Sequence, residues 1–167
     1  YWRTFWAVAM GLIGGQAESW WFTRNLLIAF VPSVIVGLAL HDRIEAMLGE
    51  PKIVAWALII GGIAILAIER MLGVARFKGI ADIPALRTLG IGFIQCLSMI
   101  PGVSRSGATI MGALALGVER RTAAEFSFFL AVPTMLGAST LELVKNRDAL
   151  ASGAANWSEI AIGFGVA

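Results

Sequence analysis

A polar loop centred on an arginine interrupts a long apolar part of the chain. Residues 101–109 read Pro-Gly-Val-Ser-Arg-Ser-Gly-Ala-Thr, with the apolar stretch Leu89–Ile100 before them and Ile110–Val118 after them. An arginine at the centre of a bilayer costs about 3 kcal/mol on insertion scales, so such a residue usually has a function. Arg105 stands between two serines and two glycines. Arginine, hydroxyl and backbone N–H donors together are typical of phosphate-binding sites.

The composition places the chain among integral membrane proteins. Of its 167 residues, 58% are apolar and 14% are charged, whereas a soluble domain has about 25% charged residues. The net charge of +2 is small and the basic residues are spread between apolar runs, so we predict no binding to nucleic acid. The chain begins without Met and stops within an apolar run. We therefore expect an internal piece of a longer protein, with residues 1–167 forming a single transmembrane domain truncated at both ends.

Four apolar segments predict helices. They are Leu26–Leu40, Ile53–Ile68, Ala123–Val144 and the beginning of a fourth at Glu159–Ala167. A full span needs about 20 residues, so the first two must extend into their flanks to cross a bilayer. The segment 69–87 is rich in turn-forming and charged residues and is predicted to be a loop. These features predict an all-α, polytopic integral membrane protein.

The segment 86–118 admits two arrangements, because neither apolar half reaches across a bilayer alone. It forms either one broken span or a re-entrant helical hairpin that enters and leaves on the same face. Irregular backbone at membrane depth is tolerated where protein or a water-filled cavity surrounds it. Half-helix N-termini in such elements often point at anionic groups.

The distribution of basic residues predicts the orientation of the chain. If 118–122 lies on the same side as 69–87, one face carries Arg3, Arg24, Arg70, Arg76, Lys78, Arg87, Arg120 and Arg121. The other face then carries Arg43, Lys52, Lys145 and Arg147. The first face carries eight basic residues and the second carries four, so the first face, which includes the N-terminal segment, is predicted to be cytoplasmic. A broken span at 86–118 also gives eight basic residues on one face and four on the other, so the distribution of charge does not choose between a broken span and a re-entrant hairpin.

Eight residues in and around the loop are candidates for the anion site. The residues predicted to contact the reacting phosphate are Arg105, Ser104, Ser106 and Thr109, and those predicted to help bind substrate are Gly102, Gly107, Gln95 and Glu125. The alternative is that these residues have only a structural role. Ser104 or Ser106 is then the N-cap of a helix beginning near Ala108, and the Arg105 side chain extends to the membrane–water interface. Capping and anion binding are compatible.

Two of these candidates also have a structural interpretation. Glu125 either forms an i, i−4 ion pair with Arg121 near a helix start or faces the loop, where it orients Arg105 or assists proton transfer. Gln95 either binds phosphate or makes a hydrogen bond between helices. The tryptophans near the N-terminus are predicted to anchor the protein at the headgroups.

The small number of histidines and cysteines excludes several chemistries within this chain. His41 is the only histidine and Cys96 the only cysteine. A phosphohistidine mechanism, a two-histidine metal site and an intrachain disulfide are therefore ruled out. No Gly-x-x-x-x-Gly-Lys-Ser/Thr motif for nucleoside triphosphates occurs.

Four strings of residues resemble the undecaprenyl-diphosphatase family, the bacitracin-resistance integral membrane phosphatases. They are Ile94-Gln95-Cys96-Leu97, Pro101-Gly102-Val103-Ser104-Arg105-Ser106-Gly107-Ala108-Thr109, and Ala124-Glu125-Phe126-Ser127-Phe128 with Ala131-Val132-Pro133. The resemblance runs in order from Trp2 to Ser158.

This resemblance implies hydrolysis of undecaprenyl diphosphate to undecaprenyl phosphate and inorganic phosphate, which recycles the lipid carrier for cell-wall synthesis. It implies a multi-pass protein of the bacterial plasma membrane whose active site faces the outer side. The family fold has two inverted repeats that each contribute a re-entrant hairpin, so 86–118 would be the second. The sequence also allows a homodimer.

One signature of the family is absent here, namely a glutamate-rich segment ending in Ser-Ser-Thr-Gly-His. The resemblance therefore implies that the ligands of a Mg²⁺ or Ca²⁺ ion lie outside this chain, which alone is expected to be inactive. A membrane transporter or flippase for a lipid phosphate or other anion is the alternative, because inverted repeats with broken helices also suit alternating access.

Overall fold

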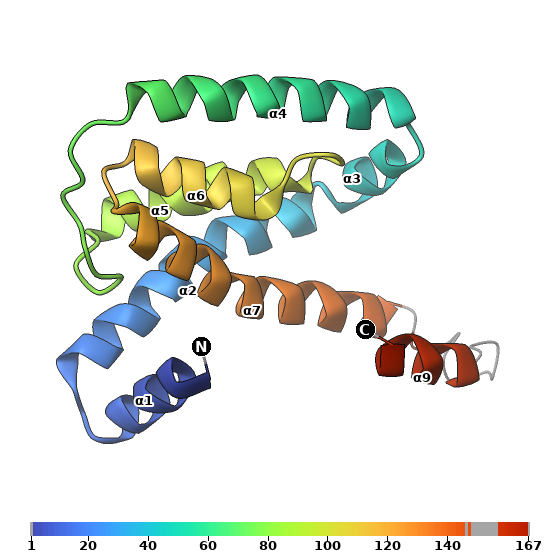
Figure 1. Ribbon diagram of the computed structural model, residues 1–167. Coiled ribbons are helices and arrows are strands. Elements are labelled where there is room, and N and C mark those ends of the chain that lie inside the picture. Colours follow the sequence, from blue (N-terminus) through green and yellow to red (C-terminus); the bar gives the residue numbers. More distant parts are fainter. Residues whose placement is uncertain (1, 146, 148–156, 167) are drawn as a thin grey trace. The chain divides into compact units, whose positions relative to one another are not determined.

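The computed structural model describes residues 2–145, 147 and 157–166, and these residues are helical throughout most of their length (Figure 1). The helices are α1 (Trp2–Ile13), α2 (Ala17–Ala39), α3 (His41–Leu48), α4 (Pro51–Met71), α5 (Ala85–Gln95), the 3₁₀ helix η1 (Cys96–Met99), α6 (Arg105–Ala115), α7 (Arg120–Lys145) and α9 (Trp157–Val166). In the described part of the chain, α2, α4 and α7 are long and apolar enough to cross a membrane. The prediction of an all-α polytopic membrane protein is confirmed.

The four predicted helices are present, and most of them are longer than the apolar runs that indicated them. The helix predicted at Leu26–Leu40 begins at Ala17, because no glycine or proline separates the tryptophan-rich flank from the apolar run. The helix predicted at Ile53–Ile68 begins at Pro51, which is well suited to a first helical turn. The predicted loop 69–87 is correspondingly shorter. The last predicted residue, Ala167, lies outside the described residues.

Two of the described α-helices were not predicted from apolar runs. They are α1, whose tryptophans were predicted only to anchor the protein at the headgroups, and the short amphipathic α3. His41 begins α3, and its Nε2 lies 3.8 Å from Glu45 Oε2. Both helices are too short to span a bilayer, so a search for long apolar runs overlooks them.

The segment 86–118 folds back on itself as a helical hairpin made of α5, η1 and α6, which we call the hairpin. Arg87 near its beginning donates a hydrogen bond to the carbonyl of Leu116 near its end. Deeper in the hairpin, Thr109 and Gln95 are hydrogen-bonded at 3.3 Å. α5 and α6 therefore pair side by side as an antiparallel hairpin, and its re-entry on one face of the membrane stays a prediction.

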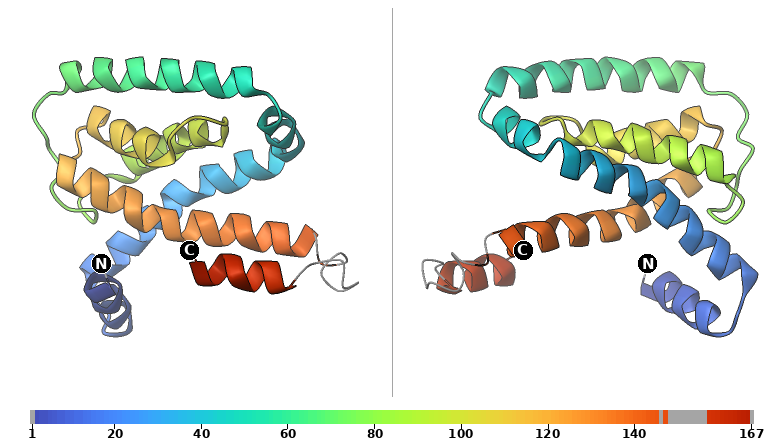
Figure 2. Two further views of the ribbon diagram at one scale, coloured as in Figure 1. Left: turned by 45° about the vertical axis from the view of Figure 1, so that its right-hand side comes forward. Right: turned by 180° about the vertical axis from the view of Figure 1, so that it is seen from behind.

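The hairpin lies between α2 and α4 in every view (Figures 1 and 2). Gly92 of α5 permits the close approach to α2, because a Cβ atom there would lie only 2.9 Å from Ala29 Cα. Gly112 of α6 similarly packs against Ile94 of α5. Small residues at such crossings bring helix backbones together, as is usual in membrane proteins.

The loop before the hairpin is attached to α2 by a buried asparagine. The Nδ2 group of Asn25 donates to the carbonyls of Ile80 and Ile83 at 2.7 and 2.9 Å. Its Oδ1 accepts from the guanidinium of Arg24. Because Asn25 is fully buried, these hydrogen bonds satisfy polar groups that would otherwise be costly.

Both ends of the hairpin meet the loop after α4 at one end of the bundle. Phe77 and Val118 form an isolated parallel β-bridge, and the amide of Glu119 donates to the carbonyl of Phe77 at 2.8 Å. Arg120 and Glu69 form an ion pair at 2.9 Å. Residues 118–120 therefore contact the segment 69–87 in the described structure, and the side of the membrane on which both lie stays a prediction.

The described chain divides into two compact units, Tyr1–Thr134 and Met135–Ala167. The first unit holds the hairpin, the helices packed against it and a buried core centred on Phe126, Phe129 and Ile91. The second holds the end of α7 and α9. The single transmembrane domain predicted for 1–167 stays a prediction.

Candidate functional site

Ser104 is the N-cap of α6. Its Oγ accepts a hydrogen bond from the amide of Gly107 at 3.1 Å, and its backbone is extended just before the helix begins. The helix therefore starts at Arg105, three residues before the predicted start near Ala108. The prediction that 101–109 is a loop is wrong for its second half, because a well-placed N-cap favours helix immediately after it.

Arg105 is half-buried and attached to α7. Its Nη1 donates to Thr134 Oγ1 at 2.7 Å and to the carbonyl oxygen of Ala131 at 3.3 Å. No partner for its Nε or Nη2 occurs among the described residues. Hydrogen bonds to α7 therefore restrain the guanidinium at Nη1. The N–H groups of Nε and Nη2 point along one edge and form the pair of donors that binds phosphate oxygens bidentately.

The two serines that flank Arg105 are exposed and adjacent. Ser104 Oγ and Ser106 Oγ lie 3.3 Å apart. Because Ser104 Oγ already accepts the Gly107 amide hydrogen, its own hydroxyl hydrogen is available for donation. The amides of the first helical turn have no acceptor within an α-helix and carry partial positive charge. Hydroxyls, amides and guanidinium therefore gather at the start of α6.

Thr109 and Gln95 lie inside the protein and not at this exposed end. Thr109 is fully buried, and its hydroxyl lies 2.9 Å from the carbonyl of Arg105 and 3.3 Å from Gln95 Oε1. Gln95 Nε2 in turn donates to Ser33 Oγ of α2 at 2.8 Å. The predicted hydrogen bond between helices at Gln95 is confirmed. A direct contact of either residue with phosphate stays a prediction.

The two glycines of the loop have different structural roles. Gly102 has a positive φ of 94°, and a Cβ atom there would lie 3.0 Å from Val54 Cα. It therefore allows the tip of the hairpin to pack closely against α4. Gly107 is helical, and its amide is used by the Ser104 cap. That amide is not available to an anion while the cap is formed.

Glu125 forms the predicted ion pair with Arg121. The Arg121 Nε and Glu125 Oε1 atoms lie 3.2 Å apart, on successive turns of α7. No hydrogen bond between Glu125 and Arg105 occurs in the described residues. The alternative in which Glu125 orients Arg105 is therefore not what this structure shows.

The residues around Arg105 do not fit a divalent cation. No group of three or more His, Cys, Asp or Glu side chains that would hold a metal ion occurs in the described part of the chain. The charged side chain at the start of α6 is a cation, which would repel a metal ion in the absence of carboxylates.

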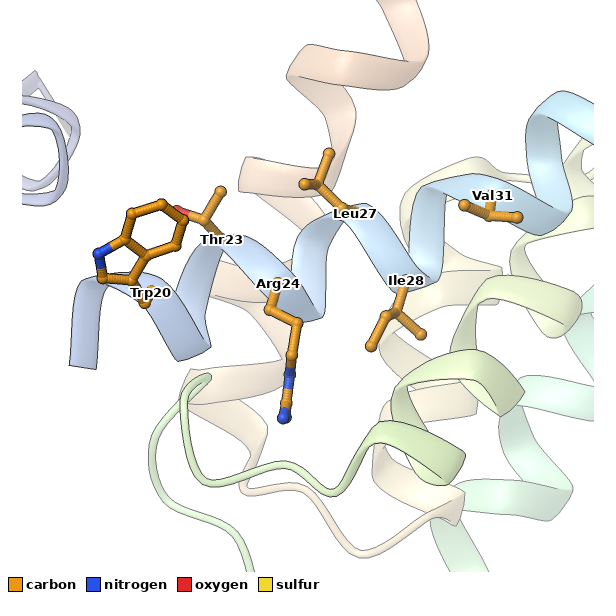
Figure 3. Close-up of a pocket in the computed structure, with 6 residues that line it drawn as sticks. All are labelled: Trp20, Thr23, Arg24, Leu27, Ile28 and Val31. Atoms are coloured by element: carbon orange, nitrogen blue, oxygen red, sulfur yellow. The ribbon is translucent and has the colours of Figure 1, made fainter. Parts of the chain in front are cut away.

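A separate apolar groove of about 370 Å³ follows one face of α2 (Figure 3). It is lined by Trp20, Thr23, Arg24, Leu27, Ile28 and Val31. None of the eight predicted site residues lines it.

Sequence-based reasoning missed Thr134, Ala131 and Ser33. Thr134 and Ala131 are 29 and 26 residues away from Arg105, and Ser33 is 62 residues away from Gln95. The string Ala131-Val132-Pro133 was part of the family resemblance, but it gave no indication of a contact with Arg105. No periodicity in the sequence indicates which helix contacts the arginine.

Together the fold and this site define a class, the polytopic helical membrane proteins that hold an arginine at the tip of a helical hairpin. Comparison with known proteins makes the assignment specific. The family model described as "Bacitracin resistance protein BacA" matches residues 1–167. The chain belongs to this family.

Curated relatives share the similarity over almost the whole chain. An undecaprenyl-diphosphatase of Novosphingobium aromaticivorans is 62% identical over 99% of this chain and 62% of its own length. Those of Sphingopyxis alaskensis and Rhizorhabdus wittichii are 53% and 56% identical over 100% and 98% of this chain. The chain spans about three fifths of the length of these relatives.

Proposed function

We propose that the full-length protein hydrolyses undecaprenyl diphosphate to undecaprenyl phosphate and inorganic phosphate. The observation that carries the proposal is the Arg105 guanidinium, which α7 holds through Nη1 while its Nε–Nη2 edge has no partner among the described residues. The names of the curated relatives supply the substrate. Nothing in the comparisons favours the transporter or flippase. Release of the monophosphate would recycle the lipid carrier for cell-wall synthesis.

Arg105 would bind the diphosphate and stabilise the charge that develops on the transferred phosphoryl group. Water supplies the oxygen of the released phosphate, and the bond from the terminal phosphorus to the bridging oxygen breaks. Ser104 and Ser106 would donate hydroxyl hydrogens to phosphate oxygens, since both are exposed beside the start of α6. In addition, the α6 N-terminus favours negative charge.

Thr109 and Gln95 would stabilise the helices that carry this site. Both are buried, and their hydrogen bonds join α6 to α5 and α2. We therefore propose that Thr109 and Gln95 stabilise the conformation of the hairpin, and that Gly102 allows the tip of the hairpin to pack against α4.

A divalent cation, Mg²⁺ or Ca²⁺, remains part of the proposal for the full-length protein only. The described residues provide no ligand set for it, so its ligands would have to come from elsewhere in that protein. No step at Arg105 is assigned to the ion.

The proposed location is the bacterial plasma membrane, with the site open to the outer side. Basic residues are concentrated where the loop after α4 meets the end of the hairpin, which favours a cytoplasmic position for that end. The hairpin tip packs near the beginning of α4, at Val54, toward the opposite end of that helix. A homodimer stays a prediction.

The test is phosphate release from undecaprenyl diphosphate by the purified full-length protein in detergent. We expect Arg105→Ala to lower kcat by about 10²–10³, the loss typical when a donor to a developing oxyanion is removed. Arg105→Lys should keep the charge and still lose rate, because lysine lacks the planar fork. Arg70→Ala, an exposed arginine at the end of α4, serves as the control.

Wild-type rates in both Arg105 variants would remove this residue from the reaction. A wild-type protein that moves the lipid between leaflets and releases no phosphate would instead support the transporter.

A further inference from the structure

Thr134 is the side chain that fixes the guanidinium of Arg105. Its Oγ1 lies 2.7 Å from Arg105 Nη1, whereas the second acceptor, the carbonyl of Ala131, lies 3.3 Å away. The shorter contact is within the ordinary range of N–H···O bonds, and the longer one is at its weak limit. Thr134 therefore provides most of the restraint on this corner of the guanidinium.

The direction of the Thr134 hydroxyl is set by its own helix. Its Oγ1 lies 2.8 Å from the carbonyl of Leu130 and 3.0 Å from that of Ala131, and both of these groups can only accept. The hydroxyl hydrogen is therefore directed at α7, and the oxygen lone pairs are left to accept from Arg105. A hydrogen bond from a charged donor is stronger than one between neutral groups.

Fixing one corner of a planar guanidinium limits where its other nitrogens can point. Arg105 is the first residue of α6, so the bond also ties the start of this helix to α7. We infer that Thr134 is a positioning residue, which orients the Nε–Nη2 edge of Arg105 toward the diphosphate. This inference rests on the proposed function.

The experiment uses three variants of the full-length protein. Thr134→Val removes the acceptor but keeps the β-branched shape, and Thr134→Ser keeps the acceptor. Thr140→Val is the matched control on the same helix: Thr140 Oγ1 also bonds the carbonyl four residues earlier, at 2.7 Å, and it receives no arginine in the described residues. Thermal unfolding in detergent verifies that each variant is folded.

We expect Thr134→Val to lower kcat for undecaprenyl diphosphate about tenfold to a hundredfold, because a displacement of about 1 Å in a reacting site costs up to about 10². KM should change much less, as for an interaction realised mainly in the transition state. Thr134→Ser should restore most of kcat, and Thr140→Val should match the wild type.

A second measurement separates positioning from a merely structural role. In an Arg105→Lys background, Thr134→Val should lower kcat by a much smaller factor than in the wild type, since the planar group that it orients is gone. A structural role predicts the same factor in both backgrounds.

The outcomes distinguish this inference from the proposed function. If Arg105→Ala lowers kcat as expected while Thr134→Val and Thr140→Val have equal kcat, only the role of Thr134 is overturned. The role of Thr134 is also overturned if Thr134→Val lowers kcat by the same factor in the wild type and in the Arg105→Lys variant. If Arg105→Ala keeps wild-type turnover, the proposed role of Arg105 fails first.

Discussion

Arg105 shows how a charged side chain is accommodated within an apolar hairpin. Its charge is partly solvated by the α7 groups Thr134 and Ala131, and its backbone begins a helix capped by Ser104. The sequence predicted the cap and the importance of the arginine, since both depend on neighbouring residues. It did not predict the α7 partners, since hydrogen bonds over 26 to 29 residues depend on which helices pack together.

At Glu125 the structure favours the local interpretation. Glu125→Gln removes the ion pair with Arg121, which is 85% exposed. Exposed i, i+4 pairs of this kind contribute about 0.3–0.5 kcal/mol. We expect a small loss of stability, and neither kcat nor its pH profile for phosphate release should change. A tenfold lower kcat, or a displaced pH profile, would show that Glu125 takes part in the reaction.

Among the elements, the hairpin depends on close helix packing at glycines. The sequence singled out Gly102 and Gly107 beside Arg105, and of these two only Gly102 has a positive φ. The tightest approach is instead at Gly92, between α5 and α2. A glycine within an apolar run gives no sequence signal of its partner, because lipid and protein neighbours are both apolar.

Gly92→Ala tests this packing. A Cβ atom at Gly92 would lie 2.9 Å from Ala29 Cα, so α2 and α5 must separate. We expect a loss of about 1–3 kcal/mol in unfolding free energy, as for other overpacked cores, measured as a lower thermal midpoint in detergent. Gly61→Ala on α4 is the control, since no described atom lies within 4 Å of its Cβ position. Equal midpoints for the two variants would contradict the close crossing.

At the scale of the whole molecule, the orientation in the membrane is the main prediction. The charge rule places the loop after α4 in the cytoplasm and the turn between α2 and α3 outside. Contacts between Phe77 and Glu119 and between Glu69 and Arg120 bring the basic segments to one end. The same arrangement puts the hairpin tip toward the other end.

Cysteine labelling measures this orientation. In a cysteine-free full-length protein, a membrane-impermeant maleimide applied to intact spheroplasts should label Asp42→Cys and leave Val74→Cys unlabelled. Val74 is 90% exposed, so permeabilised cells should label both. The reverse pattern in intact spheroplasts would invert the topology and place the Arg105 site toward the cytoplasm.

The sequence by itself determined the class of protein, the long helices and the polar interruption between apolar runs, and it limited the cap of α6 to Ser104 or Ser106. These depend on apolar run length and on groups a few residues apart. Only the tertiary structure decided that the interrupted segment is a hairpin, that Gln95 joins Thr109 to Ser33, and that Thr134 holds Arg105. The reason is physical: helices that are apolar on nearly every face fit lipid and protein equally well, so their neighbours are set by packing and by a few distant polar contacts.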